Sequence, residues 1–231
     1  MSFGPGLSLS NRNKIINGAF GINQRGYVSA AATAAGQYTV DRWKVTGTKG
    51  ITFATVNNKT TVTIPSGQTL QQVIEGLNLQ SGTYVLSWEG TAQGRIAGGA
   101  YGVSGGVTAS ITGGVNTTIE FNAGTVSNVQ LEIGTVSTPF GHRSYAAELA
   151  MCQRYYVSIF VTHSNSPSTW YSNCYAPQPM RAVPTLTQYQ DSGGGAPPFY
   201  LHTVPITSPP SLYQGQPGGT GTARIVLSAE M

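Results

Sequence analysis

The chain has 231 residues, enough for one large or two small domains. Only 9% of them are charged, which excludes a long amphipathic helix or coiled coil, whose outer face needs many Lys and Glu side chains. The apolar fraction of 39% is too high for a disordered chain, and the net charge of +4 comes without the clustered basic residues of a nucleic-acid binder. The composition, with 30 glycines and 13 prolines, predicts an all-β protein.

Residues 1–13 are rich in Gly, Ser and Asn and have almost no apolar periodicity, so we expect a flexible arm. They show no charged segment followed by an apolar one, and no stretch of the chain approaches the roughly 18 apolar residues of a membrane helix. We therefore expect a chain that is made in the cytosol, stays soluble and does not insert into a membrane. In a reducing compartment Cys152 and Cys174 are expected to be partly buried thiols, although the two could also pair.

From residue 14 onward, short β-rich runs alternate with Gly, Pro and Asn turn residues. Strands are predicted over residues 38–45, 51–56, 60–64, 70–74, 83–89, 106–111, 116–121 and 126–133. Strands at this spacing are typical of a β-sandwich or jelly roll.

One helix is predicted over residues 145–153, after Ser144 as its N-cap. Shorter β runs follow at 155–161, 170–176, 184–189, 199–204 and 223–227, separated by Pro/Gly-rich loops, the longest at 192–198 and 208–221. So much loop leaves a thin core, which suggests stabilisation by packing on another chain. We expect a jelly-roll β-sandwich over residues 14–147, a short linking helix, and a smaller C-terminal β domain over residues 148–231.

No sequence motif in the chain points to catalysis. There is no phosphate-binding loop and no nucleophile elbow, and His142, His163 and His202 lack metal-ligand spacing. We therefore expect no catalytic residue, no metal and no cofactor. Polysaccharide cleavage normally needs two carboxylates, and the chain has only eight acids. Glu89 and Asp191 are a candidate pair for it, although nothing in their spacing supports the pairing.

Sugars are recognised by hydrogen bonds to their hydroxyls and by stacking of their C–H faces on aromatic rings, and such rings are best presented near loops. Five aromatic residues fit this description and are the candidate glycan-binding residues: Tyr101, Trp170, Tyr171, Tyr189 and Tyr200. The alternative for the last four is that they fill trimer contacts. Structural anchoring is expected of Arg25, Asp41, Arg42, Trp43, Glu132, Arg143 and Arg154.

Several segments resemble, in their order and spacing, bacteriophage tail-fibre and receptor-binding proteins that carry a carbohydrate-binding-module-like β-sandwich. These segments are residues 15–26 (IINGAFGINQRG), 38–43 (YTVDRW), 129–134 (VQLEIG), 138–143 (TPFGHR), 148–156 (ELAMCQRYY) and 180–185 (MRAVPT). One departure is Gly141, where the family often has an acidic residue, so that an ion pair with a neighbouring Arg would be missing. The resemblance implies a jelly-roll domain, then a C-terminal β domain, assembled as a homotrimer on a virion.

The expectation is therefore a non-enzymatic virion fibre or spike protein that is assembled in the host cytoplasm. It would bind bacterial surface polysaccharide during adsorption and contact other virion proteins through residues 1–13. The first alternative is a head or collar decoration protein that stabilises the particle. The second is a polysaccharide depolymerase.

Overall fold

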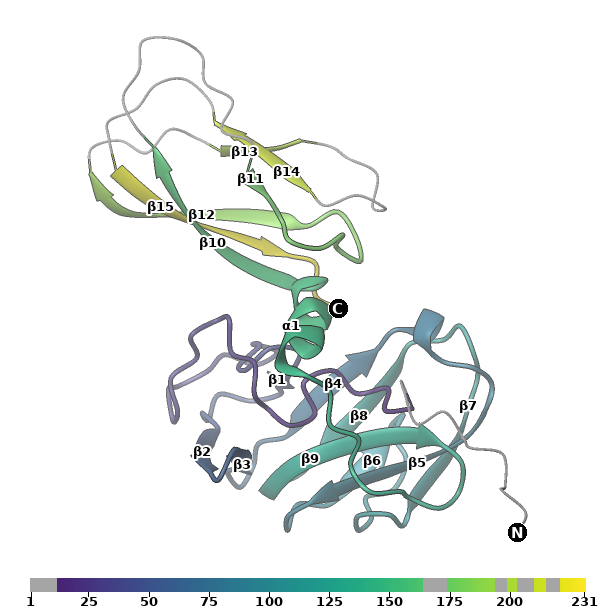
Figure 1. The fold of residues 1–231 in the computed structure, drawn as a ribbon. Coiled ribbons are helices and arrows are strands. Elements are labelled where there is room, and N and C mark those ends of the chain that lie inside the picture. The colour runs from purple at the N-terminus through teal and green to yellow at the C-terminus, as the bar shows by residue number, and fades with distance from the viewer. Residues whose placement is uncertain (1–11, 164–173, 194–198, 203–209, 215–220) are drawn as a thin grey trace. The chain divides into compact units, whose positions relative to one another are not determined.

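The computed structural model describes residues 12–163, 174–193, 199–202, 210–214 and 221–231. The chain divides into two compact units, residues 1–144 and 145–231 (Figure 1). Each unit is described by itself below. The division lies three residues before the domain boundary that the sequence suggested.

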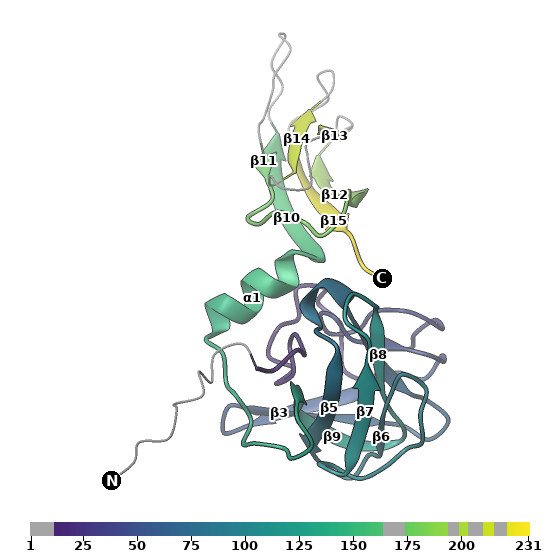
Figure 2. The ribbon, with the colours of Figure 1, turned by 90° about the vertical axis from the view of Figure 1, so that its right-hand side faces the viewer.

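The first unit consists of two antiparallel sheets. One has the strand order β1-β4-β8-β6, with β1 (Lys44–Val45), β4 (Leu70–Ile74), β8 (Thr117–Phe121) and β6 (Gly94–Ile96). The other has the order β2-β3-β9-β5-β7, with β2 (Thr52–Val56), β3 (Lys59–Ile64), β9 (Gly124–Ile133), β5 (Gly82–Glu89) and β7 (Val107–Ile111). A 3-10 turn, η1 (Gly76–Asn78), follows β4. Figure 2 shows β3, β9, β5 and β7 of the second sheet from another side.

Alternation of apolar and polar residues explains why these runs form strands with one buried face. In β3, Val62 and Ile64 are buried while Thr63 between them is exposed. Apolar side chains from both sheets meet in a single core cluster. At its centre the Trp43 ring lies 4.9 Å from the Phe20 ring, measured between centroids.

The β2–β3 hairpin is fixed by its turn. Val56 pairs with Lys59, which leaves Asn57 and Asn58 as the two loop residues. Both have positive φ, 49° and 60°, as a type I′ turn requires, and Asn tolerates this conformation better than most residues.

The first predicted strand, 38–45, is wrong over most of its length. Its β-branched and aromatic residues favour a strand, but Arg42 has φ of 72° in the left-handed region, which interrupts the extended backbone. Only Lys44–Val45 forms a strand, and Tyr38 contributes an isolated bridge to Lys44.

The prediction that residues 1–13 form a flexible arm is also wrong for residues 12 and 13. Asn13 is buried, where its side-chain amide donates to the Val129 carbonyl at 3.0 Å and its Oδ1 accepts from the Ile15 amide at 2.9 Å. Arg12 lies 3.7 Å from the Glu132 carboxylate. The packed unit therefore includes residues 12 and 13, and the rest of the expected arm lies outside the described residues.

The second unit begins with helix α1 (Tyr145–Gln153), which has the predicted bounds. One three-stranded sheet has the order β10-β15-β12, with β10 (Tyr156–His163), β15 (Gly221–Ser228) and β12 (Thr185–Gly193). A second has the order β11-β14-β13, with β11 (Cys174–Tyr175), β14 (Ser211–Gln214) and β13 (Phe199–His202). A small core that includes Val157, Ile225 and Leu227 lies against the first sheet.

Within the described residues the all-β expectation and the single short α-helix are confirmed, whereas jelly-roll connectivity stays a prediction. The sequence missed β6, which has only three residues, and β14, which lies inside the loop expected over 208–221. The loop expected over 192–198 begins too early, because β12 continues through Gly193 across a bulge between Gln190 and Ser192. Cys152 is buried in the second unit, and the Cys174 side chain lies outside the described residues.

Candidate functional site

The outer face of the sheet β1-β4-β8-β6 carries a row of side chains in register across neighbouring strands. Lys44 pairs with Gln71, Gln71 with Glu120, and Glu120 with Arg95. A tyrosine extends each end, because Tyr38 bridges to Lys44, and the Gly94–Gly102 bridge brings Tyr101 beside Arg95. We call these six residues the cross-strand row. At the usual spacing between strands, five intervals span about 24 Å.

Glu120 forms the centre of the row. Its side chain is only 7% exposed and lies 2.6 Å from the Arg95 guanidinium. The same carboxylate accepts hydrogen bonds from the Tyr101 hydroxyl and the Gln71 side-chain amide. Burial by itself raises the pKa of Glu120, but the bonds from Tyr101 and Gln71 and the charge of Arg95 together outweigh burial and lower it. The carboxylate is therefore ionised at neutral pH and has three donor residues around it.

Each end of the row is a tyrosine with a cation over its ring. Arg95 lies 4.5 Å from the Tyr101 ring centroid, and Arg25 lies 4.9 Å from the Tyr38 ring centroid. Burial, reinforced by the bond to Glu120, raises the pKa of Tyr101 to about 12, so its hydroxyl stays protonated and donates. Cation–π contacts of this kind hold the rings in place.

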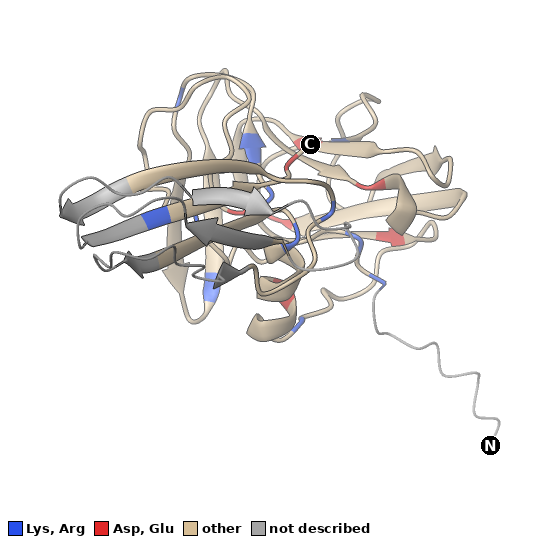
Figure 3. Ribbon diagram, turned by 90° about the horizontal axis from the view of Figure 1, so that it is seen from above, with Lys and Arg blue, Asp and Glu red and all other residues tan. Residues whose placement is uncertain are grey.

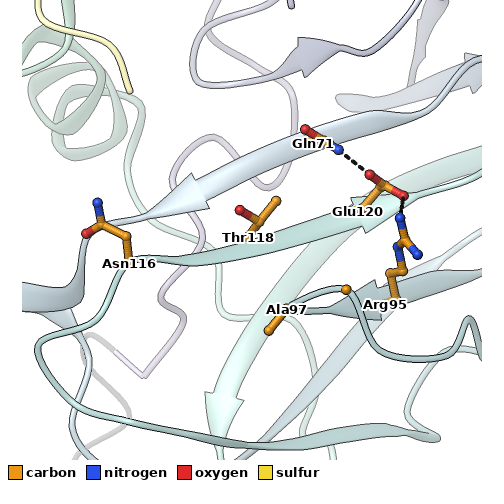
Figure 4. Close-up of a pocket in the computed structure, with 7 residues that line it drawn as sticks. Gln71, Arg95, Ala97, Asn116, Thr118 and Glu120 are labelled. Atoms are coloured by element: carbon orange, nitrogen blue, oxygen red, sulfur yellow. Dashed lines mark hydrogen bonds and ion pairs between the residues drawn. The ribbon is translucent and has the colours of Figure 1, made fainter.

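A pocket of about 410 Å³ lies beside the row. It is lined by Gln71, Arg95, Ala97, Gly98, Asn116, Thr118 and Glu120. Figure 4 shows the Glu120 side chain between Gln71 and Arg95, with Thr118 on the same strand. The lining presents amide, hydroxyl and guanidinium groups, which donate and accept hydrogen bonds without a net charge from the Arg95–Glu120 pair.

This chemistry suits recognition of a hydroxyl-bearing ligand better than bond cleavage. Glycoside hydrolysis uses two carboxylates, one of them a protonated acid. Glu120 is the one carboxylate in the lining of the pocket as the structure describes it, and its lowered pKa is opposite to that of a general acid. Within the described part of the chain, no group of three His, Cys, Asp or Glu side chains is placed to hold a metal ion.

The carboxylates proposed for a depolymerase lie elsewhere. Glu89 is 53% exposed and pairs with Lys59, and it also accepts a hydrogen bond from the Asn128 amide at 2.8 Å. The hydrogen bond from Lys59, followed by that from Asn128, lowers the pKa of Glu89. Asp191 is in β12 of the other unit, and its side chain lies outside the described residues.

The expected glycan-binding aromatics are divided between the two units, and the structure describes the side chains of Tyr101 and Tyr189. Tyr101 is partly buried in the cross-strand row, rather than standing free in its Gly-rich loop. Tyr189 is on β12 and 46% exposed, whereas Tyr200 is on β13 of a different sheet and its side chain lies outside the described residues. Trp170 and Tyr171 also lie outside the described residues.

Several expected anchors lie in one buried network. The Asn17 side-chain amide donates to the carbonyls of Ile22 and Asp41, at 2.8 and 2.9 Å. The Asn17 carbonyl accepts from the Trp43 indole at 2.9 Å. The Asp41 carboxylate accepts from the Gln24 side-chain amide at 2.6 Å. These contacts connect the segments 15–26 and 38–43, two of those that carry the resemblance.

The charged members of these two segments occupy the same neighbourhood. Arg25 Nε lies 3.9 Å from the Asp41 carboxylate. Arg42 is buried, and its guanidinium donates to the Val73 carbonyl at 2.7 Å. The segments 15–26 and 38–43 thus supply contacts that hold the unit together, apart from the pocket.

The remaining expected anchors connect other segments. Glu132 is buried and accepts from the Thr138 backbone amide at 2.8 Å and the Thr138 hydroxyl at 2.7 Å. Arg143 donates to the Ile15 carbonyl at 2.8 Å and to the Asn13 carbonyl. The Arg154 side chain is exposed, whereas its carbonyl accepts from the Arg181 amide at 2.9 Å.

Sequence reasoning missed Gln71, Arg95 and Thr118 as pocket residues. The available signal was the alternation in 117–121, where Ile119 and Phe121 are buried while Thr118 and Glu120 face the other way. Nothing in the sequence showed that Gln71 and Arg95 would lie on either side of Glu120.

Lys, Arg, Asp and Glu positions are scattered along the ribbon of both units, and the part drawn in colour has no long run of basic residues (Figure 3). Among the residues that the structure describes, no helix has the length and apolar character needed to cross a membrane.

No protein-family model matches the chain, and no curated protein sequence matches it. Among solved structures, the chain is similar to a cycloisomaltooligosaccharide glucanotransferase from Paenibacillus sp., complexed with cycloisomaltoheptaose. The identity is 9%, the TM-score is 0.26, and the match covers 89% of this chain and 46% of the enzyme. The chain thus matches less than half the length of that enzyme, and a TM-score this low carries no argument about fold or activity.

Proposed function

We propose that the pocket and the cross-strand row bind a neutral carbohydrate chain, and that the protein is a virion fibre or spike protein that adsorbs to bacterial surface polysaccharide. In this proposal the protein binds the polysaccharide without cleaving it.

The observation that carries the binding proposal is that the polar pocket of about 410 Å³ lies beside the cross-strand row, which ends in the rings of Tyr38 and Tyr101. A sugar in the pocket would meet the Gln71 and Asn116 amides and the Thr118 hydroxyl, which match the mixed donor and acceptor character of sugar hydroxyls. Arg95 is 31% exposed and retains donors beyond its bond to Glu120. Because Glu120 neutralises Arg95, the pocket does not require a charged ligand.

A virion context is supported by the resemblance to tail-fibre proteins of the segments 15–26, 38–43, 129–134, 138–143, 148–156 and 180–185. In the first unit these segments supply internal contacts, as the network around Asn17 illustrates, and Tyr38 in addition ends the cross-strand row. If these segments form a scaffold shared with tail-fibre proteins, the side chains on the outer strand faces can differ between proteins and bind different ligands. The proposed homotrimer is tested by light scattering, where a particle of 24 kDa would refute it.

The binding proposal is tested by filling the pocket. Thr118→Leu adds an apolar side chain to the lining while leaving the hydrogen bonds of Glu120 in place. Thr63→Leu, at an exposed position on β3 of the other sheet, is the matched control. Calorimetry with neutral gluco-, galacto- and manno-oligosaccharides should show binding by the wild type and the control, with at least tenfold weaker binding by Thr118→Leu.

Whole cells test the biological proposal. Purified protein is incubated with host-type bacteria and with the same cells stripped of surface polysaccharide. Binding that disappears on stripping supports a glycan adhesin. Equal binding to both, or Thr118→Leu binding as well as Thr63→Leu, would contradict the proposal and favour a purely structural role in the particle.

A further inference from the structure

The sheet β10-β15-β12 has a second row of side chains, on the face turned away from the core of its unit. Phe160 of β10 and Tyr189 of β12 both pair with Arg224 of β15. Paired residues point to the same face of a sheet, so the three side chains stand side by side, about 5 Å apart between strands. We call these three residues the arginine row.

The arginine row is open on its outer side. Phe160 is 71% exposed and Tyr189 is 46% exposed, whereas Ile225, the next residue after Arg224, is fully buried on the opposite face. Along the same face Ser158, Val226 and Thr187 are in register with one another, and there Thr187 is exposed whereas Val226 is buried. Two large rings on edge strands of a small sheet thus flank one guanidinium group, which lies over the Tyr189 ring.

The charge of Arg224 is not neutralised within the row. Its guanidinium carbon lies 4.5 Å from the Tyr189 ring centroid, so the ring fixes the orientation of the planar group. No ion pair joins Arg224 to any carboxylate whose side chain the structure describes. Here the arginine row differs from the pocket, where Arg95 is paired with Glu120 at 2.6 Å.

We infer that the arginine row binds a carboxylate-bearing sugar residue of an acidic polysaccharide. The carboxylate would form two parallel hydrogen bonds with the Arg224 guanidinium, and the C–H face of the sugar ring would lie against Phe160 or Tyr189. The inference rests on the proposed carbohydrate-binding function but assigns a different site, on the other unit, and a different charge class of ligand.

Charge complementarity favours this occupant over a second copy of the same face. A partner row would present Phe160, Arg224 and Tyr189 again, and none of these supplies a carboxylate to Arg224. Burying the guanidinium without a counter-charge would be costly. An acidic sugar supplies both the counter-charge and an apolar ring face.

The test compares acidic oligomers with their neutral methyl esters. Full-length protein is titrated calorimetrically with oligomers of galacturonic, guluronic and sialic acid, and with the methyl esters of the same oligomers. At least one acidic oligomer should bind about tenfold or more tightly than its ester, because charged hydrogen bonds are lost on esterification. Its affinity should also fall as salt is added.

Variants locate the binding. Arg224→Gln should abolish the preference for the acid over the ester, and Arg224→Lys should retain part of it, because lysine keeps the charge without the two-pronged geometry. Phe160→Ala should weaken both ligands. Thr187→Ala, an exposed residue of the same face outside the row, is the matched control and should bind like the wild type.

Three outcomes would overturn the inference: no acidic oligomer binds, acid and ester bind equally, or Arg224→Gln retains the preference. If the protein binds no sugar and Phe160→Ala forms a smaller particle than the wild type in light scattering, the arginine row is a contact with a second copy of the chain. The pocket is tested independently of the arginine row, because Thr118→Leu should no longer bind neutral oligosaccharides but should still prefer the acidic oligomer over its ester. Either site can therefore fail without the other.

Discussion

Replacing Glu120 by Gln tests the central interaction of the cross-strand row. The carboxylate is 7% exposed and accepts from Tyr101, Gln71 and Arg95, the last at 2.6 Å. An amide keeps one acceptor oxygen but turns its other end into an NH2 group that faces a donor. At least one charge-assisted hydrogen bond is lost, and the remaining partner is left unsatisfied.

The expected cost is about 3 kcal/mol, the lower end of the range for breaking a buried ion pair, because Arg95 is 31% exposed and water compensates part of the loss. For a unit of this size that cost lowers the melting temperature by about 10 °C. Glu89→Gln is the matched control, since Glu89 is also a strand glutamate paired with one cation but is 53% exposed. Its pair with Lys59 should contribute less than about 1 kcal/mol.

Thermal unfolding followed by tryptophan fluorescence is the assay, because two of the three tryptophans, Trp43 and Trp88, are buried in the first unit. The pH dependence gives a second readout. Glu120 has a lowered pKa in the folded state, so its contribution is present above the ordinary value of about 4.5 and is lost as pH falls below it. Glu120→Gln should remove this part of the acid-induced loss.

Equal melting temperatures for Glu120→Gln and Glu89→Gln at pH 7 would refute the reasoning. The same conclusion would follow if Glu120→Gln left the acid limb of the stability curve unchanged. Either result would mean that solvent, and not the buried donors, balances the carboxylate.

Two further predictions concern backbone packing and the tyrosine of the row. Gly18→Ala should destabilise the first unit by about 2–4 kcal/mol, because the added Cβ would lie 2.3 Å from the Val129 carbonyl oxygen. Gly21→Ala, whose Cβ would have nothing within 4 Å, is the control and should unfold in urea like the wild type. Similar urea midpoints for the two variants would contradict this prediction. Tyr101→Phe removes the hydrogen bond to Glu120. Because the pKa of Tyr101 is raised to about 12 in the folded state, the wild type should lose stability between pH 10 and 12 more steeply than this variant. Parallel curves of stability against pH for the two proteins would count against the hydrogen bond.

Local sequence pattern was sufficient for most of the elements. The segments 70–74 and 145–153 formed elements with the predicted bounds, because turn residues 65–67 precede the first and Ser144, the expected N-cap, precedes the second. The pattern failed at 38–45, where the left-handed backbone at Arg42 and the buried bonds of Asp41 determine the conformation. Such tertiary contacts override the strand preference of Tyr, Val and Trp.

The candidate site was less accessible to sequence reasoning. Its polar residues come from strands centred near residues 44, 71, 95 and 120, and only the order of strands in the sheet makes them neighbours. Tyr101 was found from its Gly-rich loop, but its partners Arg95 and Glu120 could not be assigned without the register. Tyr189 was likewise found without Phe160 and Arg224.

The two rows differ in the way an arginine is balanced, and this difference determines which ligand each one suits. In the cross-strand row an acidic sugar would have to compete with Glu120 for Arg95, and it would be repelled by that buried carboxylate. In the arginine row no carboxylate whose side chain the structure describes pairs with Arg224, so a sugar carboxylate would supply a counter-charge that a neutral sugar lacks. A polysaccharide with both neutral and acidic residues in its repeat offers a ligand to each row. Thr118→Leu should therefore weaken the binding of its neutral residues, and Arg224→Gln the binding of its acidic residues, each without affecting the other.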